Sequence, residues 1–559
     1  MANFYQQDLN LQRLLKNSLS DEFFQWADKE LIDFGRICAE EIDERAVHTD
    51  REGQPKLFRY DKMGNEVSHI WLNDGYQKTV EDTYNSGIVG YIHKEIPELE
   101  SKGNYIYAFA QGYLLSHAEP GVYCPVTLTK ATAYLIDHYA SDELKHTFLP
   151  HVLSTGDVEL YEGATFLTER QGGSDVGANV VKAEREGDHY RIYGEKYFAS
   201  NAGACGVAMV LARLEGAPEG TKGLSLFLIP WEENREEGLL RIRRLKDKLG
   251  VRAVPSAEVE FDGAKGFLVG EENKGFYYMI EALNLSRVCN AVASLGIMRR
   301  SYLEAKKYAI ERRAFGSVLT DYPMVRATLS EMAAKQEVKT NAMFEVIQLM
   351  DQVMDVETKA NTSEKDKLLF RLYVAIMKKE TAEQAIHFAH EAIEMHGGNG
   401  YIEDFVTPRL LRDAQVLTVW EGTANILGLE VLRLIGKYNV DQFFVEEMRG
   451  RLAVLENDDQ SNSDDYREWQ VILDKEISKL SDKINFVKGL SFELQTYYCK
   501  EISEQMSAIF ESVVAVESFY KEDVRQRAIS DVYLQSVWKK DEFQEKPVQL
   551  TRFMEIVEN

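Results

Sequence analysis

The chain has 559 residues, of which 45% are hydrophobic and 11% aromatic. This composition excludes a wholly disordered protein, and the length favours three or four domains or one large multi-lobed unit. Asp and Glu outnumber Lys and Arg by 91 to 65, which gives a formal charge of −26. Because so acidic a surface repels phosphate backbones, nucleic acid is disfavoured as the main partner.

Cysteine spacing and hydropathy indicate the cellular compartment of the protein. The five cysteines are odd in number, far apart and without a CxxC pair, so we interpret them as reduced thiols. The first residues lack the apolar core of a signal peptide, and no run approaches the ~18 consecutive apolar residues of a membrane span. We therefore expect a cytoplasmic protein without a membrane span.

Hydrophobic spacing predicts helices first and strands next. Residues 1–157 show mostly helical spacing, whereas residues 158–274 change to period two. Within the second segment, 256–262 alternates apolar and acidic residues, 224–229 is a short apolar run, and 189–193 is a further strand candidate. The sequence thus predicts an N-terminal helical domain followed by a β domain.

The helical period returns at about residue 275. A stripe at steps of three and four predicts a long amphipathic helix, in which Arg299 and Arg300 fall off the apolar face. The polar and acidic stretch 457–465 predicts a loop before a last helical block. We predict four domains: 1–157 helical, 158–274 β, 275–438 a helical bundle, and 439–559 a helical extension.

Four glycine-containing clusters could bind a ligand. They are 168–175 (TERQGGSD), 197–203 (YFASNAG), 311–316 (ERRAFG) and 396–401 (HGGNGY). Glycine pairs let a backbone approach a planar or phosphate-bearing ligand closely, and arginines can pair with phosphate. Each cluster alone is better explained by a turn, a packed aromatic or a helix end.

A fifth cluster joins 412–414 (RDA) to 420–426 (WEGTANI). Glu421 stands between a tryptophan and a glycine, where partial desolvation would raise its pKa toward the range of a general base. A solvated glutamate at a turn is the alternative. His387 and His390 lack the HExxH arrangement, so we interpret them as structural histidines and predict no metal site.

Taken together and in this order, the five clusters resemble the flavin-dependent acyl-CoA dehydrogenase family over roughly residues 20–438. The resemblance implies a mainly α fold with a central β domain. Its parts are an N-terminal helical domain, a β-barrel-like middle domain and a C-terminal four-helix bundle, here with a helical extension. The LTERQGGSDV form of the first cluster and the block after Tyr438 resemble the larger AidB-like and long-chain branch of the family.

The resemblance also implies FAD as the cofactor. Thr168 would bond the pyrimidine side of the flavin, Phe198 would stack near its face, and the Ser200 hydroxyl would reach its reactive nitrogen. Arg312 and Phe315 would contact the FAD of a neighbouring subunit, which implies a homo-oligomer, with a dimer favoured. The full set of implied cofactor-binding residues is Leu167, Thr168, Gly173, Ser174, Phe198, Ser200, Arg312, Phe315, Glu394, Gly397, Gly398, Thr423 and Asn425.

The implied catalytic base is Glu421. The family places its glutamate either after the RDA segment or just before an arginine that matches Arg287, and the second position holds Ser286 here. Pro323 stands where smaller members often have a glutamine toward the neighbouring FAD, a departure that concerns the contact between subunits. The implied substrate-binding residues are Ser174, Asn284, Arg287 and Gly422.

The predicted activity is dehydrogenation of an acyl-CoA to the trans-2-enoyl-CoA, within the β-oxidation of fatty acids. Electron-transfer flavoprotein is the electron acceptor that the family implies. The alternatives are an acyl-CoA oxidase of the same fold and an AidB-like flavoprotein that binds DNA in an alkylation response. Residues 440–559 hold 25 acidic and 15 basic residues, which argues against DNA binding.

Overall fold

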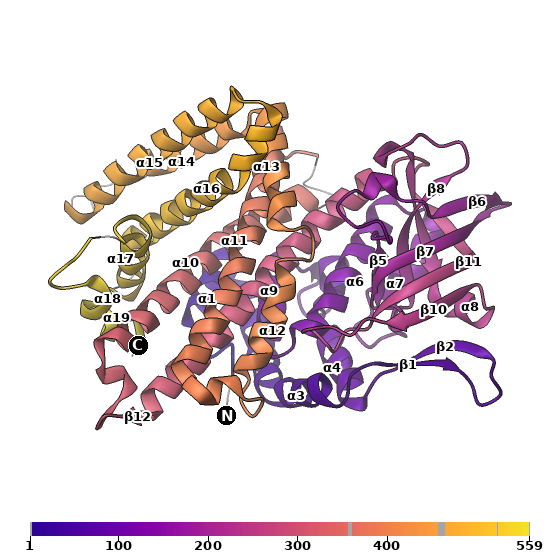
Figure 1. Ribbon diagram of the computed structural model, residues 1–559, viewed down its shortest axis with the longest axis horizontal. Coiled ribbons are helices and arrows are strands. Elements are labelled where there is room, and N and C mark those ends of the chain that lie inside the picture. The colour runs from indigo at the N-terminus through magenta and orange to yellow at the C-terminus, as the bar shows by residue number, and fades with distance from the viewer. Residues whose placement is uncertain (1–2, 356–359, 457–463, 522–523, 541, 558–559) are drawn as a thin grey trace. The chain divides into compact units, whose positions relative to one another are not determined.

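The computed structural model describes residues 3–355, 360–456, 464–521, 524–540 and 542–557. Helices, a β domain and helices again follow one another along the chain, as the sequence predicts (Figure 1). The chain forms two compact units, Met1–Cys289 and Asn290–Asn559. The boundary between them lies inside one long helix, so each unit contains two of the four predicted domains, apart from the first turns of that helix. The domain limits themselves stay a prediction.

Among the residues that the structure describes, seven α-helices make up most of the first 152 residues. They are α1 (Leu9–Ser18), α2 (Asp21–Ile37), α3 (Asp43–Arg51), α4 (Asp74–Asn85), α5 (Tyr105–Ala118), α6 (Pro120–Tyr139) and α7 (Asp142–Val152). Several of these helices have a side-chain N-cap. In each, the cap side chain accepts a hydrogen bond from the amide three residues later, and the caps are Ser20, Asn73, Asn104 and Ser141. Such side chains satisfy amides that have no partner within the helix.

Small sheets interrupt these helices. Strands β1 (Lys56–Tyr60) and β2 (Glu66–Trp71) form an antiparallel hairpin, closed where the Asp61 carboxylate accepts from the amides of Met63 and Asn65. The helical spacing of residues 1–157 gave no sign of this hairpin, because most of β1 is exposed and shows no alternation. A second, shorter pair joins β3 (Glu95–Ile96) to β4 (Ser101–Lys102).

The β domain confirms the predicted barrel-like architecture. Its strands are β5 (Gly163–Phe166), β6 (Lys182–Glu186), β7 (His189–Ser200), β8 (Val207–Leu214), β9 (Leu224–Pro230), β10 (Leu240–Leu245) and β11 (Ser256–Val269), with helix α8 (Trp231–Glu236) after β9. Strand β11 pairs with β7 along its first part and with β9 at its end, and β9 also pairs with β8, which closes the sheet on itself. The three predicted strand segments, 189–193, 224–229 and 256–262, lie in β7, β9 and β11, so those predictions are confirmed.

Long helices form most of the second unit. The bundle consists of α9 (Gly275–Glu311), which enters from the first unit, α10 (Pro323–Met354), α11 (Glu364–His396), α12 (Thr407–Leu417) and α13 (Ala424–Tyr438). The extension consists of α14 (Val440–Glu456), α15 (Asp464–Lys488), α16 (Phe492–Lys521), α17 (Val524–Trp538), α18 (Val548–Thr551) and α19 (Phe553–Val557). The loop predicted at 457–465 falls mostly on 457–463, outside the described residues.

The long helix predicted here is confirmed as α9, but two arginines off its apolar stripe are buried. Only 5% and 6% of the surfaces of Arg299 and Arg300 are exposed. Arg300 pairs with Glu304 one turn later, and an Arg299 nitrogen lies 3.9 Å from Glu337 of α10. At these two positions the charged residues mark buried ion pairs rather than a solvated face.

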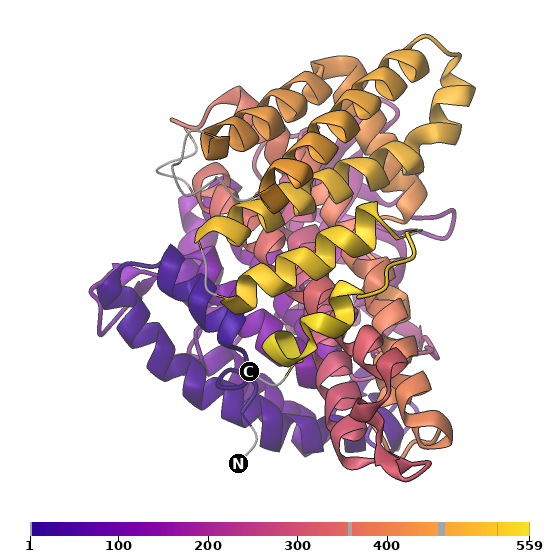
Figure 2. The ribbon, with the colours of Figure 1, turned by 90° about the vertical axis from the view of Figure 1, so that its left-hand side faces the viewer.

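The extension packs on the bundle through charges that are almost fully buried. Figures 1 and 2 show α16 and α17 beside α10 and α11. The Lys339 ammonium of α10 lies 2.8 Å from Glu380 of α11 and 2.7 Å from Glu511 of α16, and the Tyr533 hydroxyl of α17 donates to Glu511 at 2.5 Å. Opposite charges raise the pKa of Lys339 to about 12, despite its burial.

The five cysteines are free and buried, as the reduced-thiol interpretation predicts. In the described parts of the chain, no helix combines the length and apolar character that crossing a membrane requires.

A buried carboxyl lies where the helices of the first unit meet the barrel. Glu162 precedes β5, is 5% exposed, and accepts a hydrogen bond from the Tyr84 hydroxyl of α4 at 3.0 Å. Burial raises its pKa from 4.5 to about 7, more than the hydrogen bonds from Tyr84 and Asn201 lower it. The neutral form of Glu162 is therefore the one that the fold favours.

Replacing Lys339 by Met should destabilise the second unit by about 3–5 kcal/mol, because Glu511 and Glu380 would lose their shared buried cation. Chemical denaturation followed by circular dichroism measures the change. Lys483→Met is the matched control, since its pair with Glu501 is about half exposed on both sides and contributes at most about 1 kcal/mol. Equal effects of the two variants would contradict a buried ionic contact between bundle and extension.

Glu162→Gln should stabilise the protein at pH 8 and leave it unchanged near pH 4. A carboxyl whose folded pKa is raised contributes stability below its unfolded pKa of 4.5 and loses it as pH rises toward 7. The rise in the pKa of Glu162 from 4.5 to about 7 corresponds to about 3 kcal/mol in the free energy of unfolding. Denaturation midpoints of both proteins across this pH range test the prediction, and parallel curves would refute it.

Candidate functional site

The loop from Leu167 to Asp175, here called the 167–175 loop, follows β5 and is held by a buried ion pair. The Lys196 ammonium, from β7, lies 2.8 Å from Glu169 and 3.3 Å from the carbonyl oxygen of Leu167. Neither charged side chain is more than 2% exposed, and burial lowers the pKa of Lys196 despite its partner. The sequence reading placed Glu169 in the cluster without a role and did not single out Lys196.

Glu169 also orders the chain beyond the loop. Its carboxylate accepts from the amides of Val180 and Val181, at 2.7 and 3.2 Å, and Asn179 donates to the Leu167 carbonyl at 2.8 Å. The side chains of Glu169 and Asn179 thus supply hydrogen-bond partners to backbone groups that have none in the sheet. The loop can remain open at its tip because its base is fixed.

The tip of this loop leaves room for a ligand. Gly172 has φ of +133°, a conformation that L side chains rarely adopt, and a methyl group built there would meet nothing within 4 Å. A methyl group on Gly173 would lie 2.5 Å from the Thr168 hydroxyl oxygen, so any side chain there would displace Thr168. Ser174 is exposed, whereas Leu167 and Thr168 are half-buried.

Strand β7 ends beside this loop and carries the second predicted cluster. The amide of Tyr197 donates to the Thr168 carbonyl at 2.9 Å, which ties the end of the strand to the loop. Phe198 is 52% exposed, with the Lys246 ammonium 4.7 Å from its ring centroid. The Ser200 hydroxyl lies 3.4 Å from that of Ser256. An exposed aromatic face and a hydroxyl therefore follow each other next to an open glycine loop.

Two of the predicted substrate-binding residues contact each other. An Arg287 guanidinium nitrogen donates to the Asn284 side-chain oxygen at 3.2 Å, one turn apart on α9. Asn284 is buried and Arg287 is half-buried. This bond fixes the direction of the guanidinium on the helix.

In the second unit, the arginine cluster and the glycine cluster lie together. Tyr308 of α9 stacks on His396 with centroids 4.2 Å apart, and its hydroxyl accepts from Asn399 at 3.1 Å. Arg312 follows one turn later, before the hairpin of β12 (Arg313–Ala314) and β13 (Ser317–Val318), whose turn leaves Phe315 98% exposed. Gly397 and Gly398 are exposed, with nothing within 4 Å of an added methyl group, and Glu394 is exposed as well.

The predicted base lies in a strained turn between α12 and α13. Glu421 has φ of +59° and Gly422 has φ of +103°. A left-handed conformation costs a non-glycine residue about 1–3 kcal/mol, and such outliers cluster at active sites. Glu421 is half-buried. Strained backbone at the one matching glutamate supports a functional role that the sequence reading could only infer by resemblance.

A lysine far away in the sequence holds this turn. Lys378 of α11 is 1% exposed, and its ammonium donates to the Gly422 carbonyl oxygen at 2.7 Å, across 44 residues. A hydrogen bond from a charged group contributes about 1.5–3 kcal/mol, comparable to the strain at Glu421. Immediately afterwards, α13 begins without a side-chain cap at Thr423, and both Thr423 and Asn425 are exposed.

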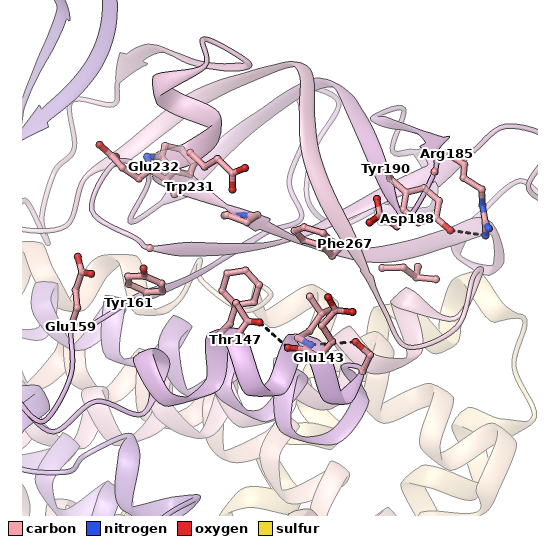
Figure 3. A pocket seen from close by; sticks show the side chains of 18 residues that line it. Glu143, Thr147, Glu159, Tyr161, Arg185, Asp188, Tyr190, Trp231, Glu232 and Phe267 are labelled. Atoms are coloured by element: carbon pink, nitrogen blue, oxygen red, sulfur yellow. Dashed lines mark hydrogen bonds between the residues drawn. The ribbon is translucent and has the colours of Figure 1, made fainter.

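A separate cavity lies between α7 and the barrel (Figure 3). It measures about 790 Å³, and Glu143 and Thr147 of α7 face Phe267 of β11 across it, with Tyr161 and Glu159 at one end. None of the predicted site residues lines it. The cavity is therefore distinct from the loops described above.

Comparisons with known proteins identify relatives of this chain. Family models match the N-terminal domain of the adaptive response protein AidB at residues 1–156, and the middle and C-terminal domains of acyl-CoA dehydrogenases at 164–264 and 273–435. The chain is 30% identical to acyl-CoA dehydrogenase family member 11 of Caenorhabditis elegans, covering 82% of this chain and 75% of that protein. It is 31% identical to AidB of Escherichia coli, covering 68% and 69%.

Solved structures show the same fold. Caenorhabditis elegans ACDH-11 in complex with C11-CoA superposes with a TM-score of 0.86 at 26% identity, covering 98% of this chain and 92% of that one. The structure titled Bd2924 apo-form gives a TM-score of 0.80 at 29% identity, covering 92% and 97%.

Lys196→Met should loosen the 167–175 loop. Glu169 would keep its amide donors but lose its buried counter-charge, at a cost of about 3–5 kcal/mol. Hydrogen exchange at Val180 and Val181, whose amides donate to Glu169, should accelerate. Arg170→Met is the control, because the Arg170 side chain is 66% exposed and its pair with Glu195 contributes little. Unchanged exchange in Lys196→Met would contradict the anchoring role.

Proposed function

The chain belongs to the acyl-CoA dehydrogenase family, and we propose on that basis that it dehydrogenates an acyl-CoA thioester to the trans-2-enoyl-CoA with bound FAD. The observation that carries the proposal is the strained, half-buried turn at Glu421, the residue to which the resemblance assigns the role of base. A relative of the same fold is titled as a complex with C11-CoA, which supports an acyl-CoA as the substrate class.

The described residues fit FAD in three respects. Gly172, Gly397 and Gly398 leave open space at the backbone, which a pyrophosphate or a planar ring could approach closely. Phe198 offers an exposed aromatic face. The uncapped start of α13 offers amides and a favourable dipole to an anion.

Each side chain has a proposed task around this cofactor. Thr168, with Leu167 beside it, would bond the flavin, and Ser200 would direct its hydroxyl to the ring. Gly173 and Ser174 would hold the pyrophosphate and the CoA side, and Thr423 and Asn425 would bind the far end of the cofactor. When bound, FAD would supply the acceptor for the β hydrogen, which leaves as hydride.

Glu421 would take the α proton. Because that carbon is a weak acid, the developing enolate needs hydrogen-bond donors at the thioester oxygen, and the backbone amide of Glu421 is one such donor. Removing a preorganised donor of this kind typically costs about 3–4 kcal/mol of transition-state stabilisation. Arg287, fixed by Asn284, would orient the substrate along α9, and Gly422 gives the thioester room beside the base.

Electron-transfer flavoprotein is the proposed acceptor, and the proposed assembly is a homo-oligomer, with a dimer favoured. Phe315 is 98% exposed at a hairpin turn, and Arg312 beside it is exposed too. These two residues would reach the FAD of a second copy, and Glu394, Gly397 and Gly398 would lie along the adenosine-pyrophosphate end of FAD. An oxidase reaction would share every group named here and differ only in passing electrons to oxygen.

Glu421→Gln should purify with bound flavin but fail to reduce it with any saturated acyl-CoA. The amide cannot accept the α proton, so the rate of flavin bleaching in anaerobic stopped flow should fall by at least about 10³-fold. Glu493→Gln, an exposed residue of α16, is the control and should react like the parent protein. Near-normal bleaching by Glu421→Gln would remove Glu421 from the mechanism.

A further inference from the structure

Two neighbouring lysines of α11 serve different partners. Lys379 pairs with Glu383 on its own helix and with Glu504 of α16, both at 2.9 Å. Lys378 instead donates to a backbone carbonyl, that of Gly422, in the turn that follows α12. Lys379 therefore contacts the extension, whereas Lys378, the residue before it, contacts the turn that carries Glu421.

We propose that Lys378 is a positioning residue for Glu421: its buried ammonium holds the Gly422 carbonyl and so keeps the glutamate in its left-handed backbone conformation, aimed for proton abstraction. The inference rests on the proposed function, because it assigns Lys378 a task only if Glu421 is the base.

The geometry favours this role over a general packing role. Glu421 and Gly422 both have positive φ, so the turn is not the conformation that this sequence would adopt unaided. The carbonyl bound by Lys378 belongs to the residue directly after the base, and fixing its peptide plane restricts the backbone on which Glu421 depends. Lys378 is almost fully buried on a long helix, which makes it a rigid anchor rather than a mobile surface contact.

The same bond also connects to the start of α13. The peptide that Gly422 shares with Thr423 leads directly into this helix, whose first residue is Ala424. A bond to the Gly422 carbonyl therefore fixes the conformation of the turn. It also fixes the direction in which the first amides of α13 point. A displaced turn would move the base relative to the substrate carbon, and a 1 Å misplacement can cost about 10²-fold in rate.

The experiment compares Lys378→Met, Lys378→Arg and Lys378→Gln with the parent protein and with Lys367→Met, a lysine on the first turns of the same helix. The substrate is the saturated acyl-CoA that bleaches the parent flavin fastest. Three quantities are measured: the limiting rate of flavin reduction, the half-saturating acyl-CoA concentration, and the isotope effect with α-deuterated acyl-CoA.

Lys378→Met should keep its flavin and bind acyl-CoA with a half-saturating concentration within about twofold of the parent, yet reduce flavin roughly 10- to 100-fold more slowly. The isotope effect should be at least as large as in the parent, because proton abstraction is the slowed step. Lys378→Arg, which keeps a charged donor, should recover part of the rate. Lys367→Met should behave like the parent.

A parent-like limiting rate in Lys378→Met would overturn the proposal, as would a loss explained wholly by weaker acyl-CoA binding. If Lys378→Met does not fold, Lys378→Gln takes its place under the same criteria. The glutamine side chain is polar, but it is shorter than lysine and carries no charge. Failure of the proposed function gives a different result: the parent flavin itself would stay oxidised with every acyl-CoA, and normal bleaching by Glu421→Gln would remove Glu421 as the base. Inactive Glu421→Gln with fully active Lys378 variants would refute only the positioning role.

Discussion

The candidate site depends on loops that leave regular secondary structure and must be held from outside. Backbone groups in such loops lack ladder or helix partners, and the strained residues among them would relax unless something fixed them. In three loops a lysine ammonium supplies that bond: Lys196 to Leu167, Lys378 to Gly422, and Lys248 to the carbonyls of Val251 and Val254. Two of these loops contain a non-glycine residue with positive φ, Val251 and Glu421.

Because many buried cations of this acidic chain are already paired, the proposed anionic ligands would depend on local groups. Many of its internal lysines and arginines are committed to carboxylates or carbonyls, as Lys339 and Arg451 are, with Arg451 pairing both Glu345 and Glu517. The groups that could bind a cofactor or a CoA thioester are open glycines, hydroxyls, the uncapped start of α13 and a few arginines. The charge of −26 therefore describes the surface as a whole and not the proposed site.

The sequence predicted the order of elements because helical and strand spacing are both strong signals over long segments. It predicted the strand over 256–262 from alternation alone, and the clusters around Thr168 and Glu421 by resemblance. It did not show that Arg299 and Arg300 are buried, since a charged residue buried in an ion pair looks the same as a solvated one in a periodic pattern. Strand β1, most of which is exposed, gave no alternation to detect.

The anchoring lysines were missed for a related reason. A single lysine within a helix or strand carries no local signal, and Lys378 acts on a carbonyl 44 residues away. Only the folded chain brings such pairs together.

The central claim is that this chain uses FAD to dehydrogenate acyl-CoA thioesters. It is tested most directly by anaerobic titration of the purified protein with saturated acyl-CoAs from short to very long chains, followed by the flavin absorbance band. The account predicts that at least one chain length bleaches the band, with the matching enoyl-CoA as the product. A flavin that stays oxidised with every member of the series would contradict it.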